Sequence, residues 1–250
     1  MRFFVLSAAL FLSVCHAAEA QIPEKFENLE VLPKDISRAE LTQVMRSFAM
    51  GLGVRCQYCH VVKQGGNPNN LESLDFKADD KIEKKKARVM MKMVRTVNTT
   101  LLPDVPERAE PQINVQCVTC HRGSPLPRTL DRILVEAIEK QGVDSAVARY
   151  RQLREQTLVQ GRYNFSEQTL NEVAQQLVAA QKTAEAIRML ELNQEFNPGS
   201  AQIDFQIGEI HRARGEKDLA IARYRKAVEK QPNHQQAARR LQEMNTENRN

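Results

Sequence analysis

The chain of 250 residues contains no tryptophan, and it has only five histidines and five cysteines. Beyond its first 20 residues, no apolar run approaches the roughly 20 residues that a membrane-spanning helix needs. Hydrophobic residues make up 42% and charged residues 27% of the sequence, while glycine and proline number ten each. This composition excludes a fibrous chain and a disordered chain, and it leaves room for one large domain or two modest ones.

The N-terminus has the features of an export signal. Residues 1–20 combine a basic start, an apolar run over 3–14 and small residues that end at Ala20. This order is typical of a signal peptide, so we predict cleavage after Ala20 and a soluble mature protein in the periplasm. Cys15 leaves a lipoprotein open as the alternative, although Val14 stands where a lipoprotein signal favours a small residue.

The other four cysteines belong to two identical units, in which a histidine directly follows two cysteines separated by two residues. The units are Cys56, Cys59 and His60, and Cys117, Cys120 and His121. This spacing is typical of c-type haem attachment: the cysteines form thioether bonds to the porphyrin, and the adjacent histidine ligates the iron. We therefore predict two covalently bound haem c groups.

Three other kinds of site also use paired cysteines. A zinc ribbon separates its two pairs by about 15–20 residues, whereas Cys59 and Cys117 lie 58 positions apart. A thioredoxin-like redox pair needs no histidine after it, and both units have one. Structural disulfides would not produce two identical units that each carry a histidine, so haem attachment is favoured.

The net charge of +5 is mild, and most of it falls between residues 21 and 128. Each haem brings two propionates, which would use this local excess of positive charge. Nucleic-acid binding needs clustered basic side chains whose charge is not already neutralised by other groups. We predict no nucleic-acid partner.

Two amphipathic helices are expected beside the cysteine units. The first follows a capping box at 37–40 and ends at Gly53, where apolar residues at helical spacing stop. The second begins near the acidic pair 79–80 and ends before Pro103. The lysine run 84–86 on this helix is predicted to be a solvated face.

The region 129–245 has the pattern of continuous helix with an internal repeat. A shift of 34 residues aligns small, aromatic and proline landmarks, such as Pro198 with Pro232. That period is typical of tetratricopeptide helix pairs, and about three pairs are expected. About six extra residues near 161–166 interrupt the first repeat, and 246–250 form a polar tail.

The ligand opposite each motif histidine is expected to be a methionine. Outside the predicted signal and the two units, the remaining histidines are His211 and His234, and both lie in the repeat region. Methionine is a common partner of histidine on haem iron. The first half of the chain offers Met45, Met50, Met90, Met91 and Met93. From the residues alone, a methionine on an apolar stripe is equally consistent with core filling.

Two segments of the chain resemble consecutive haem segments of the photosynthetic reaction centre cytochrome c subunit family. The first carries Val44-Met45, Phe48 and Leu52-Gly53-Val54 before Cys56; the second carries Ala87-Arg88, Met90, Met93, Arg95 and Val97-Asn98 before Val115 and Cys117. The resemblance covers about residues 30–127 and implies that Met45 and Met90 ligate the two irons. The family's full subunit binds four haems, whereas two are predicted here, and the repeat region is foreign to it.

The expected fold class is mainly α, with a small two-haem cytochrome c domain over 21–128 and a tetratricopeptide-like domain over 129–245. An iron held by histidine and methionine has no open position, so the predicted function is one-electron transfer and not enzymatic catalysis. The resemblance implies re-reduction of a photo-oxidised donor.

The expected partners are redox proteins, a membrane-associated electron-transfer complex and a protein bound by the repeats. Two alternatives stay open at this point. One is a peroxidase-like enzyme with two haems, which needs a displaceable ligand on one iron. The other is an assembly protein built on the repeats, with haem as its sensor.

Overall fold

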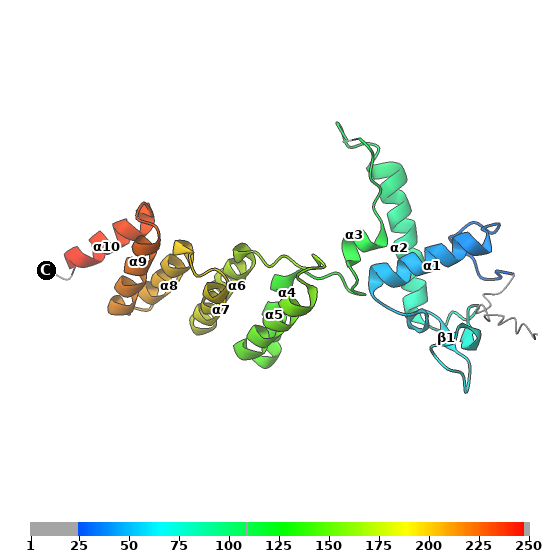
Figure 1. Cartoon of the computed structure of the whole chain (residues 1–250), viewed down its shortest axis with the longest axis horizontal. Helices are drawn as coiled ribbons and strands as arrows, with labels where there is room; N and C mark the ends of the chain where they lie inside the picture. The colour runs from blue at the N-terminus through cyan, green and yellow to red at the C-terminus, as the bar shows by residue number, and fades with distance from the viewer. Residues whose placement is uncertain (1–24, 109, 248–250) are drawn as a thin grey trace, which may run out of the picture. The chain divides into compact units, whose positions relative to one another are not determined.

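The computed structural model describes residues 25–108 and 110–247 (Figure 1). The chain divides into two compact units, residues 1–127 (unit 1) and 128–250 (unit 2). The predicted signal peptide lies outside the described residues, as do the last three residues of the predicted polar tail. None of the described helices is both long and apolar enough to cross a membrane.

Unit 1 begins its regular structure with helix α1, Arg38–Leu52. The predicted capping box is present: the Ser37 hydroxyl accepts from the Glu40 amide at 3.2 Å, and the Glu40 carboxylate accepts from the Ser37 amide at 3.1 Å. The helix ends at Gly53, which has a φ of 65°. Both ends of this helix confirm the sequence prediction, because the local signals alone specify them.

The second helix of unit 1, α2, runs over Ile82–Thr96 and continues into a π turn at Val97–Leu101. It begins after the predicted start at 79–80, because the Asp79 carboxylate is held by side chains of α2 itself and stays outside the helix. The other elements of unit 1 are short. They are the 3-10 turns Cys56–Tyr58 and Leu71–Ser73, the strands β1 (Val61–Val62) and β2 (Leu74–Asp75), which pair antiparallel, and the helix α3 (Cys117–His121).

Unit 2 is a row of helix pairs, as Figure 1 shows for α6 with α7 and for α8 with α9. Its described helices are α4 (Leu130–Gln141), α5 (Val143–Thr157), α6 (Glu167–Ala179), α7 (Thr183–Phe196), α8 (Ala201–Ala213), α9 (Lys217–Lys230) and α10 (Gln235–Glu247). The starts of α6, α8 and α10 lie 34 residues apart, as do those of α7 and α9. The predicted repeat is therefore present, and the segment between α5 and α6 holds the extra residues.

The helix pairs of unit 2 enclose an apolar core of three clusters, the largest of which extends from α4 to α8. Leu134, Tyr150, Leu170 and Met189 are among its fully or almost fully buried side chains. Burial of this kind is the main favourable term in folding, so unit 2 carries its own stabilising core. The mainly α fold with tetratricopeptide-like repeats follows from this arrangement.

Gly208 is the small residue that lets α8 and α9 approach closely. A Cβ atom at this position would lie 2.6 Å from Cε1 of the buried Tyr224 ring. We expect Gly208→Ala to lower the free energy of unfolding of unit 2 by about 1–3 kcal/mol, the usual cost of overpacking a core. Denaturant unfolding followed by circular dichroism measures it. Gly199→Ala is the control, since a Cβ there meets nothing within 4 Å, and equal losses in both variants would contradict the packing role.

Candidate functional site

The first cysteine unit lies on a single 3-10 turn that follows α1 directly. The amides of Cys59 and His60 both donate to the carbonyl of Cys56, at 3.2 and 3.0 Å. Cys56 is exposed and Cys59 is half-buried, and both are free thiols. Burial raises the pKa of the Cys59 thiol. The turn thus presents two cysteines to one side of the chain, with His60 immediately after them.

The ring of His60, which precedes strand β1, is held by an aromatic contact with Phe76, which follows the paired strand β2. The strands β1 and β2 pair Val61 with Asp75, which brings the next residue, Phe76, beside His60. The two rings meet edge to face, with centroids 4.9 Å apart and planes at 66°. Nδ1 of His60 is buried without a hydrogen-bond partner. The ring is therefore placed by packing and not by a hydrogen bond to Nδ1.

Burial is the main cause of a low pKa at His60. Together with the positive charges of Lys84 and Lys81, burial lowers this pKa to about 4. The imidazole is therefore neutral at pH 7. Neutral imidazole is the form that ligates a metal ion, so the electrostatics of the site suit an iron ligand.

The prediction that the lysine run 84–86 is a solvated face is wrong for Lys84. This side chain is buried, whereas Lys85 and Lys86 are exposed. Nζ of Lys84 donates to the carbonyls of Phe76 and Ala78, each at 2.8 Å. A sequence run of three lysines gives no sign of this, because the acceptors belong to a loop that folds back onto α2.

The second cysteine unit forms the short helix α3. The Gln116 amide donates to Oγ1 of Thr119 at 3.0 Å at its start, and Arg122 ends it with a φ of 47°. Nδ1 of His121 lies 2.9 Å from the carbonyl oxygen of Ser124. Because a carbonyl oxygen only accepts, Nδ1 carries a proton, so the neutral form of this imidazole has its lone pair on Nε2. This is the tautomer that metal-bound histidines commonly use.

Two glycines at the end of α1 lie against the second cysteine unit, Cys117 to His121, and the residues just after it. A Cβ at Gly51 would be 3.1 Å from the amide nitrogen of Val118, and a Cβ at Gly53 would be 2.2 Å from the carbonyl oxygen of Gly123. The Gly123 amide donates to the Gly51 carbonyl at 2.8 Å. The end of α1 therefore contacts both ends of α3, which carries the second cysteine unit. In sequence, however, α1 is followed by the first cysteine unit.

Asn98 fixes the chain that enters the second unit. Its Nδ2 donates to the carbonyl of Val115 at 2.9 Å, and its Oδ1 accepts from the Val115 amide at 2.8 Å. This two-sided bond joins the π turn at the end of α2 to the residues just before Cys117. No local pattern in the sequence indicates this bond, because Val115 lies 17 positions from Asn98.

The two methionines that the resemblance selects lie on the long helices of unit 1. Met45 is half-buried on α1, and Met90 is 36% exposed on α2. Met50, by contrast, is 72% exposed near the end of α1. The helix of Met45, α1, contacts the second cysteine unit through Gly51. The helix of Met90, α2, also carries Lys84. The ligand role of both methionines stays a prediction.

Unit 1 has little apolar core of its own. Among its described residues, the buried hydrophobic side chains are Leu41 and Leu74. Among the described residues, its exposed large apolar side chains are Met50, Tyr58, Ile82, Val89, Met90, Met93, Leu101, Val105, Ile113, Val118 and Leu126. So much exposed apolar surface in a small unit indicates a large apolar ligand. A porphyrin held by the four cysteines fits this surface and the histidine that follows each cysteine pair.

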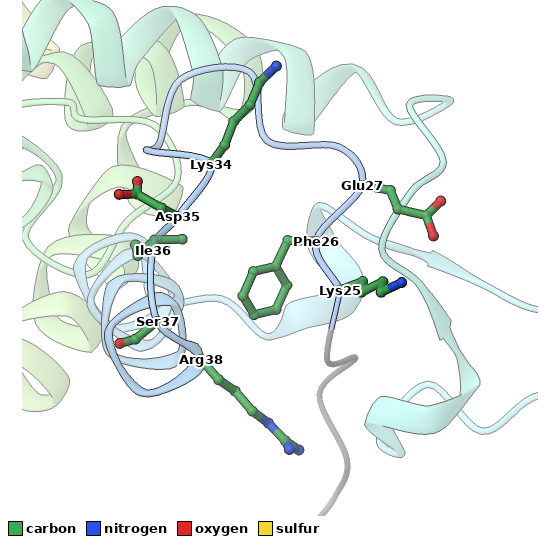
Figure 2. Close-up of a pocket in the computed structure, with 8 residues that line it drawn as sticks. All are labelled: Lys25, Phe26, Glu27, Lys34, Asp35, Ile36, Ser37 and Arg38. Carbon is green, nitrogen blue, oxygen red and sulfur yellow. The ribbon is translucent and has the colours of Figure 1, made fainter.

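A separate hollow of about 690 Å³ lies between the segment that precedes α1 and the start of that helix. Figure 2 shows the ring of Phe26 in this hollow, with the side chain of Arg38 directed away from it. None of the predicted haem residues lines it. The hollow is therefore not part of either cysteine unit.

The chain is similar to known cytochrome c proteins. The model of a family described as photosynthetic reaction centre cytochrome C subunit matches residues 11–194, well over half of the chain. A photosynthetic reaction center cytochrome c subunit from Thermochromatium tepidum is 35% identical over 107 residues, 42% of this chain and 22% of that protein. Cytochrome c-554 from Chloroflexus aurantiacus is 38% identical over 100 residues, 39% of this chain and 20% of that protein. The chain thus spans about a fifth of the length of these relatives.

A solved structure titled First TPR of Spaghetti (RPAP3) bound to HSP90 peptide SRMEEVD covers 48% of this chain and 91% of that chain. The identity is 16% and the TM-score is 0.34, so this likeness carries no argument. The repeat assignment depends instead on the helix pairs of unit 2 and their 34-residue period.

The helices, the two cysteine units and the family match together define a c-type cytochrome, a class whose haem is covalently bound. The chain belongs to the photosynthetic reaction centre cytochrome C subunit family. In this chain, the cytochrome segments are joined to tetratricopeptide-like helical repeats.

Proposed function

We propose that the chain is a periplasmic electron carrier with two haem c groups. Cys56 and Cys59 would bind the first haem, and Cys117 and Cys120 the second. His60 and His121 would be the ligands on one side of each iron, with Met45 and Met90 on the other. The observation that carries this proposal is that each cysteine pair lies on one turn, directly before a histidine. The His60 ring is packed in place and neutral, and the His121 ring is oriented by a hydrogen bond from Nδ1.

Each haem, when bound, supplies reversible one-electron transfer. The chain's own residues set the conditions for it: the carbonyl of Ser124 orients His121, and Phe76 orients His60. Such outer contacts tune ligand strength and reduction potential. If the proposed histidine and methionine ligands held each iron, no open position would remain for a substrate, which favours electron transfer over an enzymatic reaction.

Redox proteins are the proposed partners of unit 1, and a membrane-associated complex with a photo-oxidised donor is one such partner. Unit 2 is proposed to bind a further protein, because stacked helix pairs make extended binding surfaces. Its large apolar core supports this role, since it makes unit 2 a module that does not depend on haem for its packing.

Replacing the two methionines tests the ligand assignment. We expect Met45→Ala and Met90→Ala each to remove methionine ligation from one haem, and to lower the reduction potential of that haem, since a methionine ligand raises it. Intact mass counts the haems, and the sulfur-to-iron absorption band of the oxidised protein reports the ligand. Met50→Ala is the control on the same helix as Met45, because its side chain is 72% exposed. An unchanged band in both test variants would refute the assignment.

A further inference from the structure

Lys84 uses its ammonium group to hold one loop of unit 1. Besides the carbonyls of Phe76 and Ala78 at 2.8 Å, Nζ lies 2.9 Å from Oδ1 of Asp79. An ammonium has three protons, and these three acceptors use all of them. The carbonyl of Lys77 lies further away, at 3.4 Å. The loop 76–79 is thus wrapped around a single buried cation.

A second layer of polar contacts keeps this arrangement in place. Oδ2 of Asp79 accepts from Nη1 of Arg88 at 2.8 Å, and Oδ1 accepts from Nδ2 of Asn28 at 3.0 Å. Nη2 of Arg88 in turn donates to Oδ1 of Asn28 at 3.0 Å. Hydrogen bonds from Arg88 and Lys84 hold the pKa of Asp79 well below its usual range. Buried charges need such partners to be tolerated.

The loop that Lys84 holds also carries the ring that contacts His60. The Phe76 carbonyl binds Nζ of Lys84, while the Phe76 ring packs against the imidazole with centroids 4.9 Å apart. Nδ1 of His60 is buried without a hydrogen-bond partner, so no polar contact of that atom fixes the ring. The orientation of His60 therefore depends on Phe76, and that of Phe76 depends on Lys84.

We propose that Lys84 is a positioning residue for the first haem, which orients His60 through Phe76 and raises the reduction potential of the iron that His60 ligates. This inference rests on the proposed haem at Cys56 and Cys59. A buried positive charge close to the ligating imidazole opposes the additional positive charge of oxidised iron. Hydrogen bonds, burial and nearby charge are known determinants of haem potentials.

Redox titration of the haem-loaded protein tests the proposal. We expect Lys84→Gln to lower the reduction potential of one of the two redox components by ~59 mV. For one electron this is a tenfold change in the equilibrium constant in favour of the oxidised haem. The other component stays unchanged. Asp79→Asn removes a negative charge from the same cluster, so it should shift that component in the opposite direction. The low-spin ferric EPR signal of one haem should change in Lys84→Gln, because it responds to the orientation of the axial ligands.

Lys84→Arg separates charge from geometry. It keeps the positive charge, so the potential should stay closer to that of the parent protein than in Lys84→Gln, while the EPR signal still changes. Lys85→Gln is the matched control, since it makes the same charge change on the exposed side of the same helix. Unchanged potentials in Lys84→Gln, or an equal shift in Lys85→Gln, would overturn the proposal. Failure of the proposed function is distinct, because the intact mass of the parent protein would then lack two haems.

Discussion

Replacing all four motif cysteines with alanine is expected to remove both haems and to unfold unit 1, while unit 2 stays folded. Among the described residues of unit 1, only Leu41 and Leu74 are buried hydrophobic side chains. A unit with so little apolar core depends on its ligand for stability, and the binding free energy of the ligand then becomes folding free energy. Unit 2 has a large apolar core and needs no such contribution.

Hydrogen exchange read out peptide by peptide measures this effect. We expect amides of α1 and α2 to exchange at the rate of an unfolded chain in the cysteine variant, and amides of α4 to α9 to keep their protection. Intact mass confirms that both haems are missing. Lys85→Ala is the control, since it changes an exposed side chain of α2 and leaves all four thiols. Native protection of α1 and α2 without haem would show that unit 1 folds by itself.

Local signals in the sequence were sufficient for the long helices. The Ser37 capping box and Gly53 define α1 because each acts on backbone groups within its own turn. The 34-residue period places the starts of the repeat helices for a related reason: each pair must bury the same apolar face against its neighbour. Such features need no knowledge of distant residues, which is why they were predictable.

Features that depend on distant contacts were missed. Lys84 looks like part of a solvated run because its acceptors, the carbonyls of 76–78, carry no signature in sequence. The ladder of β1 and β2 pairs only two residues per strand, which is too short to show an alternating pattern. Asn98 was also missed, since its partner Val115 lies 17 positions away.

The candidate site shows the same division. The spacing of each cysteine pair and its histidine is a local pattern, and the structure places each unit on one turn. The proposed methionine ligands lie on the helices α1 and α2, outside the cysteine units, so the spacing of each unit could not select them. Only the family resemblance separated Met45 and Met90 from the other methionines of unit 1.

Gly53→Ala is expected to be the most damaging single substitution in unit 1 outside the haem-binding residues. Gly53 has a φ of +65°, which costs a residue with a Cβ about 1–2 kcal/mol. The added atom would also lie 2.2 Å from the carbonyl oxygen of Gly123, so the two chain segments must separate. Overpacking of this kind costs about 1–3 kcal/mol more. Thermal unfolding of the haem-loaded protein, followed by haem absorbance, measures the combined loss.

Gly65→Ala separates the two causes. Gly65 has a similar φ of +73°, but a Cβ there meets nothing within 4 Å. We expect this control to lose only the cost of the backbone conformation, and Gly53→Ala to lose clearly more. Because Gly53 ends α1 and contacts the residue that follows α3, the difference between the variants measures how strongly the two cysteine units are joined. Equal losses would mean that the segments separate at no cost, and the second unit would then owe its position to its own haem.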